Sequence, residues 1–217
     1  MPVITGLEAH RRDKERVRLF LDHEYVLDLP LMEAARLSKG QTLTDSEVDQ
    51  LADARRLQRA YDLAIRYLSY RPRSREEVRR HLVKKKVPEI RIAEALERLH
   101  QRGYVDDWEF ARFWIRNRDR FKPMGSRALQ FELRQKGIDD EIVVALLAEV
   151  DEEASAYRAA QTRISRYRGS THQAFQQKLS ALLRRRGFGE YTIRDVVLRL
   201  QKELEERDPG YFQDHAD

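Results

Sequence analysis

The chain has 217 residues, of which 36% are charged and 41% are apolar, and it contains no cysteine. The apolar share excludes wholesale disorder, no run approaches the ~18 apolar residues of a membrane-spanning helix, and the missing cysteine excludes disulfides, thiolate metal sites and cysteine nucleophiles. Because the first residues also lack the layout of a signal peptide, we expect a soluble protein of the cytoplasm with no membrane partner.

The net charge of +5 is distributed unevenly along the chain. Residues 1–55 carry a net charge of −3 and residues 203–217 carry −5, whereas residues 56–202 hold 33 basic and 20 acidic groups, a net of +13. This imbalance favours a polyanionic partner for the middle of the chain, most plausibly nucleic acid. The solvated surface of a helix-rich protein would carry similar charges, so the charge count alone leaves both interpretations open.

The beginning of the chain has the pattern of a small β-rich leader. Residues 17–21 and 25–27 are β-favouring runs separated by a short polar turn, and residues 3–5 form a third run. They predict an antiparallel sheet that is too small to stand alone and must cover another element. The turn contains His23, a poorer residue than glycine for a tight hairpin, so its geometry stays open. A short helix over residues 31–37 is expected next, with Gly40 just past its end.

From Thr44 onward the pattern is helical. Thr44 and Glu47 have the spacing of a capping box, in which each side chain satisfies a backbone N–H of the first turn, and the helix they open should run through residue 68. Ser74 and Glu77 repeat this spacing directly after Pro72, which ends the preceding helix.

Apolar positions recur in register along the helical part of the chain. Leu82, Leu133 and Leu183 occupy one such position, at offsets of 51 and 50 residues. Five further positions keep this register: Val78, Leu129 and Leu179; Val87, Ile138 and Phe188; Ile92, Val143 and Ile193; Leu96, Leu147 and Val197; and Leu99, Val150 and Leu200. The register predicts three repeats of three helices, in which the third helix of each repeat has one buried face.

The repeats predict a mainly α fold, with three tandem three-helix units stacked into an elongated body behind the β leader. The expected segments are the leader at 1–43, repeats at 44–103, 104–150 and 151–206, and an acidic, frayed tail at 207–217. The turn before each third helix contains Gly137 or Gly187 in the later repeats, where a helix C-cap favours glycine, but Lys86 in the first.

Signals of catalysis are few. The glycines form no phosphate-binding loop and the six histidines lack the spacing of a zinc protease, so we expect no cofactor, no metal and no small-molecule ligand. Asp106 and Asp107 are the pair most like a Mg²⁺ site, and on their account a nuclease is the enzyme-class alternative. They precede an apolar helix, however, as Asp139 and Asp140 also do, and aspartate at such a place caps exposed N–H groups. We therefore expect a protein that is not an enzyme.

The helix after this aspartate pair is rich in aromatic residues, namely Trp108, Phe110, Phe113 and Trp114. Most of these rings should belong to a core. Any ring that is exposed would be able to stack on a nucleic-acid base.

Cations gather at three places: around residues 71–86, along the first helix of the second repeat, and at the end of the second helix of the third repeat. These candidate DNA- or filament-binding residues are Arg71, Arg73, Arg75, Arg79, Arg80, Lys84 and Lys85, with Lys86 beside them; Arg112, Arg116, Arg118, Arg120 and Lys122; and Arg184, Arg185 and Arg186. Basic groups that recur in stacked units would form a track for a phosphate backbone. Residues 84–86 and 184–186 would equally serve as cations at helix C-termini, which complement the helix dipole.

Three motifs carry a family resemblance: residues 71–77 (RPRSREE), 103–111 (GYVDDWEFA) and 125–138 (GSRALQFELRQKGI). They resemble the RecX family of bacterial regulators, over residues 60–147 and more weakly to residue 205. The motif residues expected to be structural are Ser74, Glu77, Leu82, Gly103, Asp106, Asp107, Phe110, Leu133 and Gly137. The chain departs from the family pattern at Lys86, where the motif has glycine, so the first turn is expected to differ in shape.

The resemblance implies tandem three-helix repeats and a cytoplasmic modulator of the RecA recombinase. Such a protein binds the filament of RecA on single-stranded DNA and restrains filament growth, ATP turnover and strand exchange in recombination and DNA repair.

The alternative is a sequence-specific DNA-binding regulator built of helix-turn-helix or Myb-like units, which also contain three helices. Myb-like units, however, spread several tryptophans through each repeat, whereas Trp108 and Trp114 here share one helix. A reading helix also needs Asn, Gln or Arg at its start, where these third helices carry Glu89, Asp140 and Glu190.

Overall fold

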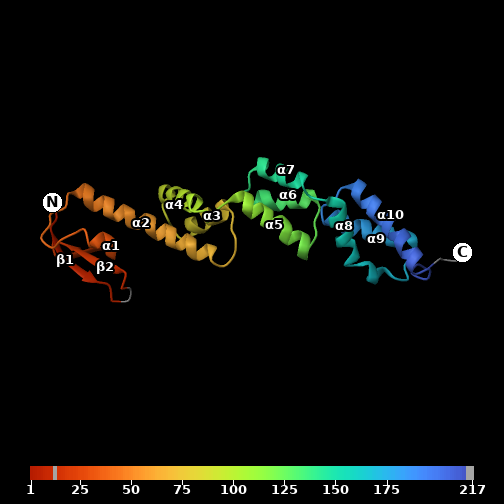
Figure 1. Ribbon diagram of the computed structural model, residues 1–217, viewed down its shortest axis with the longest axis horizontal. Coiled ribbons are helices and arrows are strands. Elements are labelled where there is room, and N and C mark those ends of the chain that lie inside the picture. Colours follow the sequence, from red (N-terminus) through yellow and green to blue (C-terminus); the bar gives the residue numbers. More distant parts are fainter. Residues whose placement is uncertain (12–13, 214–217) are drawn as a thin grey trace. The chain divides into compact units, whose positions relative to one another are not determined.

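The structure, a computed structural model, describes residues 1–11 and 14–213 and is mainly helical (Figure 1). Over these residues it contains ten α-helices and one three-stranded sheet, which confirms the predicted fold class. The chain divides into two compact units, residues 1–71 with 78–104 and residues 72–77 with 105–217. Within the described residues, no helix is long and apolar enough to cross a membrane.

The leader forms the predicted antiparallel sheet, in the order β1 (Ile4–Ala9), β2 (Arg16–Leu21), β3 (Glu24–Pro30). Asp22 and His23 make the turn between β2 and β3, with φ angles of 48° and 69°. Positive φ angles at both turn residues are typical of a two-residue hairpin with a type I′ turn. Thr5 supports this turn, because its Oγ1 accepts the backbone N–H of His23 at 2.7 Å.

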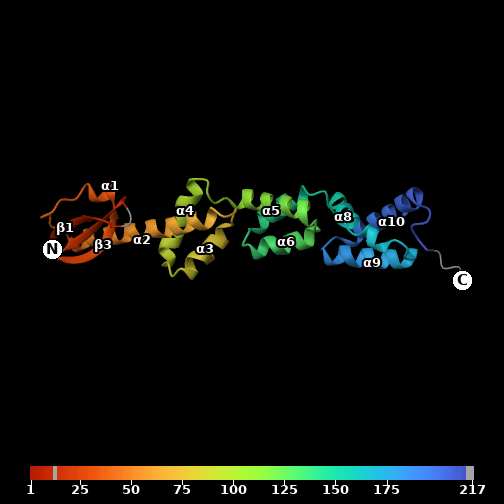
Figure 2. The ribbon, with the colours of Figure 1, turned by 90° about the horizontal axis from the view of Figure 1, so that it is seen from below.

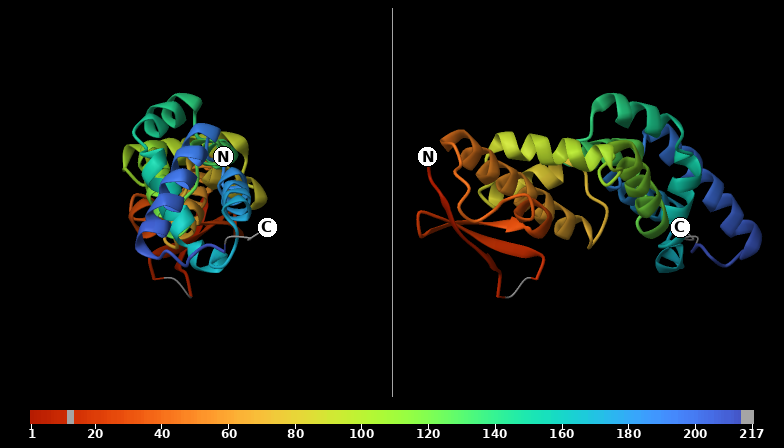
Figure 3. Two further views of the ribbon diagram at one scale, coloured as in Figure 1. Left: turned by 90° about the vertical axis from the view of Figure 1, so that its right-hand side faces the viewer. Right: turned by 60° about the vertical axis from the view of Figure 1, so that its left-hand side comes forward.

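The sheet covers the first half of a long helix (Figure 3). Helix α1 (Leu31–Ala34) is shorter than predicted, and α2 (Asp45–Leu68) begins at the predicted capping box, where Thr44 Oγ1 accepts the N–H of Glu47 at 3.2 Å. Leu19, Leu29 and Leu43 are buried from the sheet side, and Leu51 of α2 packs against their cluster. The leader therefore shares one core with α2 rather than forming a core of its own.

The rest of the first unit consists of α2, α4 (Glu89–Gln101) and residues 78–84 of α3, which spans Arg75–Lys84. Helix α4 packs along α2. The ring of Tyr61 is buried at this contact, where the guanidinium of Arg98 lies 4.6 Å from the ring centre and Arg102 donates to the tyrosine Oη at 3.2 Å.

The second unit contains two sets of three helices (Figure 2). Helices α5 (Asp107–Phe121), α6 (Ser126–Gln135) and α7 (Asp140–Ala148) surround one core, which includes Phe110 and Leu133. Helices α8 (Glu152–Gln161), α9 (His172–Arg185) and α10 (Glu190–Arg207) surround another around Phe175 and Leu183, and a 3-10 helix (Ile164–Tyr167) lies beside it.

The apolar register predicted from the sequence describes these cores well. Of its eighteen residues, fifteen are buried, and only Val87, Leu147 and Val150 are half-buried. The boundaries assigned to the three repeats stay a prediction.

The expected frayed tail is wrong for part of its length. Tyr211 and Phe212 are buried in the core of α8–α10, and each ring packs edge-on against Phe175. Two aromatic rings bury enough apolar surface to hold the chain end in place. Residues 214–217 of the predicted tail lie outside the described residues.

The turn after α3 has the shape of its two counterparts, so the expectation of a different shape is also wrong. Lys86 has a φ of 59°, beside 76° for Gly137 and 83° for Gly187. In each turn the next residue donates its N–H to the carbonyl oxygen of the equivalent leucine, as Val87 does to Leu82 at 3.2 Å. The helix ending decides the backbone conformation here, and lysine adopts the left-handed region at an energetic cost.

We therefore expect Lys86→Gly to stabilise the protein. The left-handed conformation costs a non-glycine residue roughly 1–2 kcal/mol, while glycine loses about 0.5–1 kcal/mol through the entropy of the unfolded chain. Urea unfolding should show a net increase of about 0.5–1 kcal/mol in the free energy of unfolding. The matched control is Lys85→Gly, which lacks a positive φ to relieve and should destabilise; a loss from both changes would contradict the argument.

Candidate nucleic-acid interface

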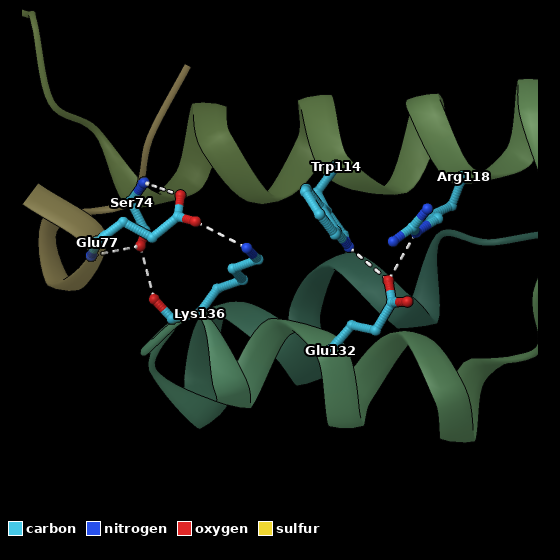
Figure 4. Close-up of polar contacts among 6 residues, drawn as sticks. All are labelled: Ser74, Glu77, Trp114, Arg118, Glu132 and Lys136. Carbon is cyan, nitrogen blue, oxygen red and sulfur yellow. Dashed lines mark hydrogen bonds and ion pairs between the residues drawn. The ribbon is translucent and has the colours of Figure 1, made fainter. Parts of the chain in front are cut away.

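The motif residues Ser74, Glu77 and Lys136 form a polar network (Figure 4). Ser74 is fully buried; its Oγ accepts the N–H of Glu77 at 3.1 Å and donates to the carbonyl oxygen of Lys136 at 2.6 Å. Lys136 Nζ donates to Glu77 Oε1 at 2.7 Å. The predicted capping box is thus present, and it also fastens the start of α3 to the end of α6.

A second group of polar side chains, which includes Glu132 of the third motif, lies between α5 and α6 (Figure 4). Glu132 Oε2 accepts Trp114 Nε1 at 2.8 Å and Arg118 Nε at 2.7 Å. The charged ends of Arg118 and Lys136 each lie 4.7 Å from the centre of the Trp114 ring, within cation–π range. Arg118 therefore contributes to helix packing, and its contact with DNA stays a prediction.

The fastening of α3 to the end of α6 has a counterpart one repeat later. Gly125, at the position equivalent to Ser74, donates its N–H to the carbonyl oxygen of Arg186 at 2.9 Å. A Cβ at Gly187 would lie 2.5 Å from the Cβ of Ala128, so only glycine fits this contact. The Arg186 side chain donates to the Pro123 carbonyl at 3.3 Å, and burial lowers the pKa of its guanidinium. Arg186 is therefore also a packing residue.

The two aspartates of the second motif cap two different helices. Asp106 Oδ1 accepts the N–H of Glu109 and so caps α5, as predicted. Asp107 Oδ1 instead accepts the N–H of Arg75 at 2.8 Å, which is the first residue of α3. Within the described residues, no group of three or more His, Asp or Glu side chains is placed to hold a metal ion.

We expect Asp107→Ala to lower the free energy of unfolding by about 0.5–2 kcal/mol, because the N–H of Arg75 in the first turn of α3 loses its acceptor. Thermal melts with and without Mg²⁺ measure this loss and test the alternative of a metal site. A Mg²⁺-dependent rise in the melting temperature of the parent, absent in the variant, would contradict the capping role.

Other predicted cations form ion pairs near the start of a helix. Arg184 makes two hydrogen bonds to Glu190, at 2.7 and 2.8 Å, which raise the pKa of the arginine and lower that of the glutamate. Arg79, also a predicted cation, pairs with Glu89 at 3.1 Å. Arg134, which was not among the predicted cations, makes two hydrogen bonds to Asp140, at 2.6 and 3.2 Å. This pairing links the second and third helices within each repeat.

The remaining predicted cations differ in exposure. Arg112 pairs with Glu109 at 3.1 Å, and Arg71, Arg73 and Arg75 are half-buried. The exposed cations are Arg80, Lys84, Lys85 and Lys86 at the end of α3, Arg116, Arg120 and Lys122 at the end of α5, and Arg185 at the end of α9. Their contact with nucleic acid stays a prediction.

Comparison with known proteins places these features in a family. Two family models match, described as the first three-helix domain of RecX over residues 60–99 and the second over residues 106–147. A protein named regulatory protein RecX from Bacillus licheniformis is 32% identical over 193 residues, covering 87% of this chain and 73% of its own length. The chain belongs to the RecX family.

Further relatives agree with this assignment. Regulatory protein RecX from Bacillus pumilus is 29% identical over 92% of this chain and 77% of its own length. A crystal structure of regulatory protein RecX matches with a TM-score of 0.73 and 25% identity, covering 90% of this chain and 98% of that one. RecX from Lactobacillus salivarius matches with a TM-score of 0.62 and 26% identity, over 69% of this chain and 99% of that one.

The polar contacts of Trp114, Glu132 and Lys136 were not predicted from the sequence. The sequence signal was present, since Glu132 and Lys136 stand in the quoted motif. Their partners are 18 and 59 residues away along the chain, however, and a motif does not name the partner.

Two arginines of α5, one in a packing contact and one exposed, should differ in their contribution to stability. Arg118→Ala should lower the free energy of unfolding by about 2 kcal/mol, because its charged hydrogen bond to half-buried Glu132 is lost. Arg116→Ala removes an exposed side chain and should change it by less than about 0.5 kcal/mol. Urea unfolding of both variants checks the difference, and equal effects would refute the assignment of Arg118 to packing.

Proposed function

We propose that this protein binds the filament of RecA on single-stranded DNA and restrains its growth, ATP turnover and strand exchange. The observation that carries the proposal is family membership: relatives named regulatory protein RecX align with 87–94% of this chain. In this proposal the protein acts in the cytoplasm, needs no cofactor and is not an enzyme.

The distribution of exposed cations supports a filament as the partner. Exposed lysines lie at the end of α3, exposed arginines and Lys122 at the end of α5, and Arg185 at the end of α9. Every helical repeat therefore offers positive charge to a polyanion. Several weak contacts within one chain raise the total affinity through effective concentration. A protein that bridges neighbouring subunits would restrain a filament without a catalytic residue of its own.

The geometry favours this partner over a base-reading regulator. The third helices α4, α7 and α10 begin with Glu89, Asp140 and Glu190, and each carboxylate is paired with an arginine of the preceding helix. A recognition helix places hydrogen-bonding side chains such as Asn, Gln or Arg at this end. Here the end is occupied by internal ion pairs.

The test is the DNA-dependent ATPase of RecA. We expect the purified protein to slow ATP turnover by RecA filaments on single-stranded DNA, while showing no ATPase or nuclease activity alone. Turnover that stays unchanged at a several-fold excess of the protein over filament sites would refute the proposal.

A variant of the exposed lysines tests the electrostatic contribution. Replacing Lys84, Lys85 and Lys86 by glutamine should weaken binding to single-stranded DNA of any sequence, because phosphate contacts carry no base information. If all three contact phosphates, the slope of log affinity against log salt should become shallower by about 2, at ~0.7 per contact. Arg118→Gln is the packing control, and it should leave the slope unchanged.

A further inference from the structure

One stripe of α5 faces away from the core of its unit. Trp114 and Arg118 point toward α6 (Figure 4), and Phe110 and Ala111 are buried. The opposite side of α5 carries Phe113, Arg116, Asn117 and Arg120, which with Glu109 and Phe121 line an open hollow of about 260 Å³. We call these six residues the α5 stripe.

The α5 stripe exposes two phenylalanine rings. Phe113 is 38% exposed and Phe121 is 70% exposed. The core of α5–α7 uses neither ring, since its buried members from α5 are Phe110 and Ala111. Rings left in water at helical spacing offer stacking surface to a ligand.

The charge of the stripe is positive. Its one carboxylate, Glu109, is paired with Arg112 at 3.1 Å. The other acidic group at this level of the helix, Asp119, is turned away, because its Oδ1 accepts from Arg158 at 2.5 Å and from Ser155 at 2.7 Å. Glu149, directly after α7, borders an adjoining hollow together with Arg112 and Arg116. Along the chain, Arg116 and Arg120 lie between the two exposed rings and Lys122 follows the second. The guanidinium of Arg120 lies 5.1 Å from the centre of the Phe121 ring.

We propose that the α5 stripe binds single-stranded DNA, with bases stacked on Phe113 and Phe121 and phosphates on Arg116 and Arg120. This inference rests on the proposed function, because it takes the DNA of the filament as the ligand. Phe113 and Phe121 are eight residues apart, or about 12 Å along a helix. That distance is several times the ~3.4 Å rise per nucleotide of a stacked strand. The two rings therefore hold different bases, and the arginines face the phosphates between them.

Stacking on the rings and contacts with the arginines are two contributions to DNA binding at the α5 stripe that can be measured separately. Stacking needs bases and is insensitive to their sequence, whereas the arginine contacts need only phosphates. Binding of the full-length protein to an oligothymidylate and to an abasic strand of equal length therefore measures the contribution of stacking.

The experiment compares three variants with the parent protein. Phe113→Leu with Phe121→Leu should weaken binding to oligothymidylate roughly tenfold or more, leaving the affinity for the abasic strand and the salt slope unchanged. Arg116→Gln with Arg120→Gln should weaken binding to both strands and make the salt slope shallower by about 1.4, at ~0.7 per contact. Phe131→Leu, which changes a ring on α6 with an exposure of 63% between those of Phe113 and Phe121, is the matched control and should change nothing. Unchanged melting temperatures establish that every variant is folded.

Two outcomes would overturn the inference while leaving the proposed function standing. In the first, the protein inhibits the RecA ATPase normally but stacking makes no contribution. The parent would then bind the two strands with equal affinity, or the phenylalanine pair and the Phe131 control would lose equal affinity for oligothymidylate. The other is a phenylalanine pair that keeps its affinity for single-stranded DNA but no longer slows the ATPase, since the stripe would then dock on protein. Absence of any effect of the parent on RecA would instead refute the proposed function.

Discussion

The left-handed turn that ends the second helix of each repeat is the constraint on which the rest of the helical architecture depends. The turn exposes the carbonyl of the preceding residue, Lys136 or Arg186, which then accepts a hydrogen bond from the start of an earlier second helix. The same turn brings Gly137 to within contact of Glu76 and Gly187 to within contact of Ala128, where a Cβ would collide with its neighbour. One backbone conformation thus both ends a helix and provides its docking surface. At the first turn Lys86 is exposed and adopts the left-handed conformation at an energetic cost.

Much of the positive charge in the middle of the chain serves the fold. Arg118 and Lys136 lie against the ring of Trp114, and Arg184 forms an ion pair with Glu190 of the same repeat. Guanidinium groups suit this task, because their planar donors match carboxylates in pairs. The excess of cations in the sequence therefore overstates the charge that is available to a partner. Of the cations predicted to bind nucleic acid, the exposed ones outside the Arg184 ion pair lie on or just after α3, α5 and α9.

Local pattern predicted the elements and cores of this fold, but not the partners of its polar side chains. The apolar register located the buried faces because burial follows helical periodicity, and the capping boxes at Thr44 and Ser74 were readable because their members are three residues apart. Asp107 looked like a cap for its own helix, but it caps a helix 32 residues earlier. Such contacts depend on how repeats pack, which no local spacing encodes. For the same reason the charge count alone did not distinguish Arg118 from Arg116.

The placement of the two tryptophans gives the protein a built-in optical reporter. The sequence contains only Trp108 and Trp114, so its tryptophan emission has two sources. Trp108 is 41% exposed, whereas Trp114 is half-buried, donates to Glu132 and lies beside two cations. One fluorophore therefore samples solvent, while the other samples the fixed charges of the network around Lys136. Loss of the contact between residues 72–77 and α6 would change the surroundings of the Trp114 indole and therefore its emission. A backbone signal, in contrast, averages this contact with every other helix.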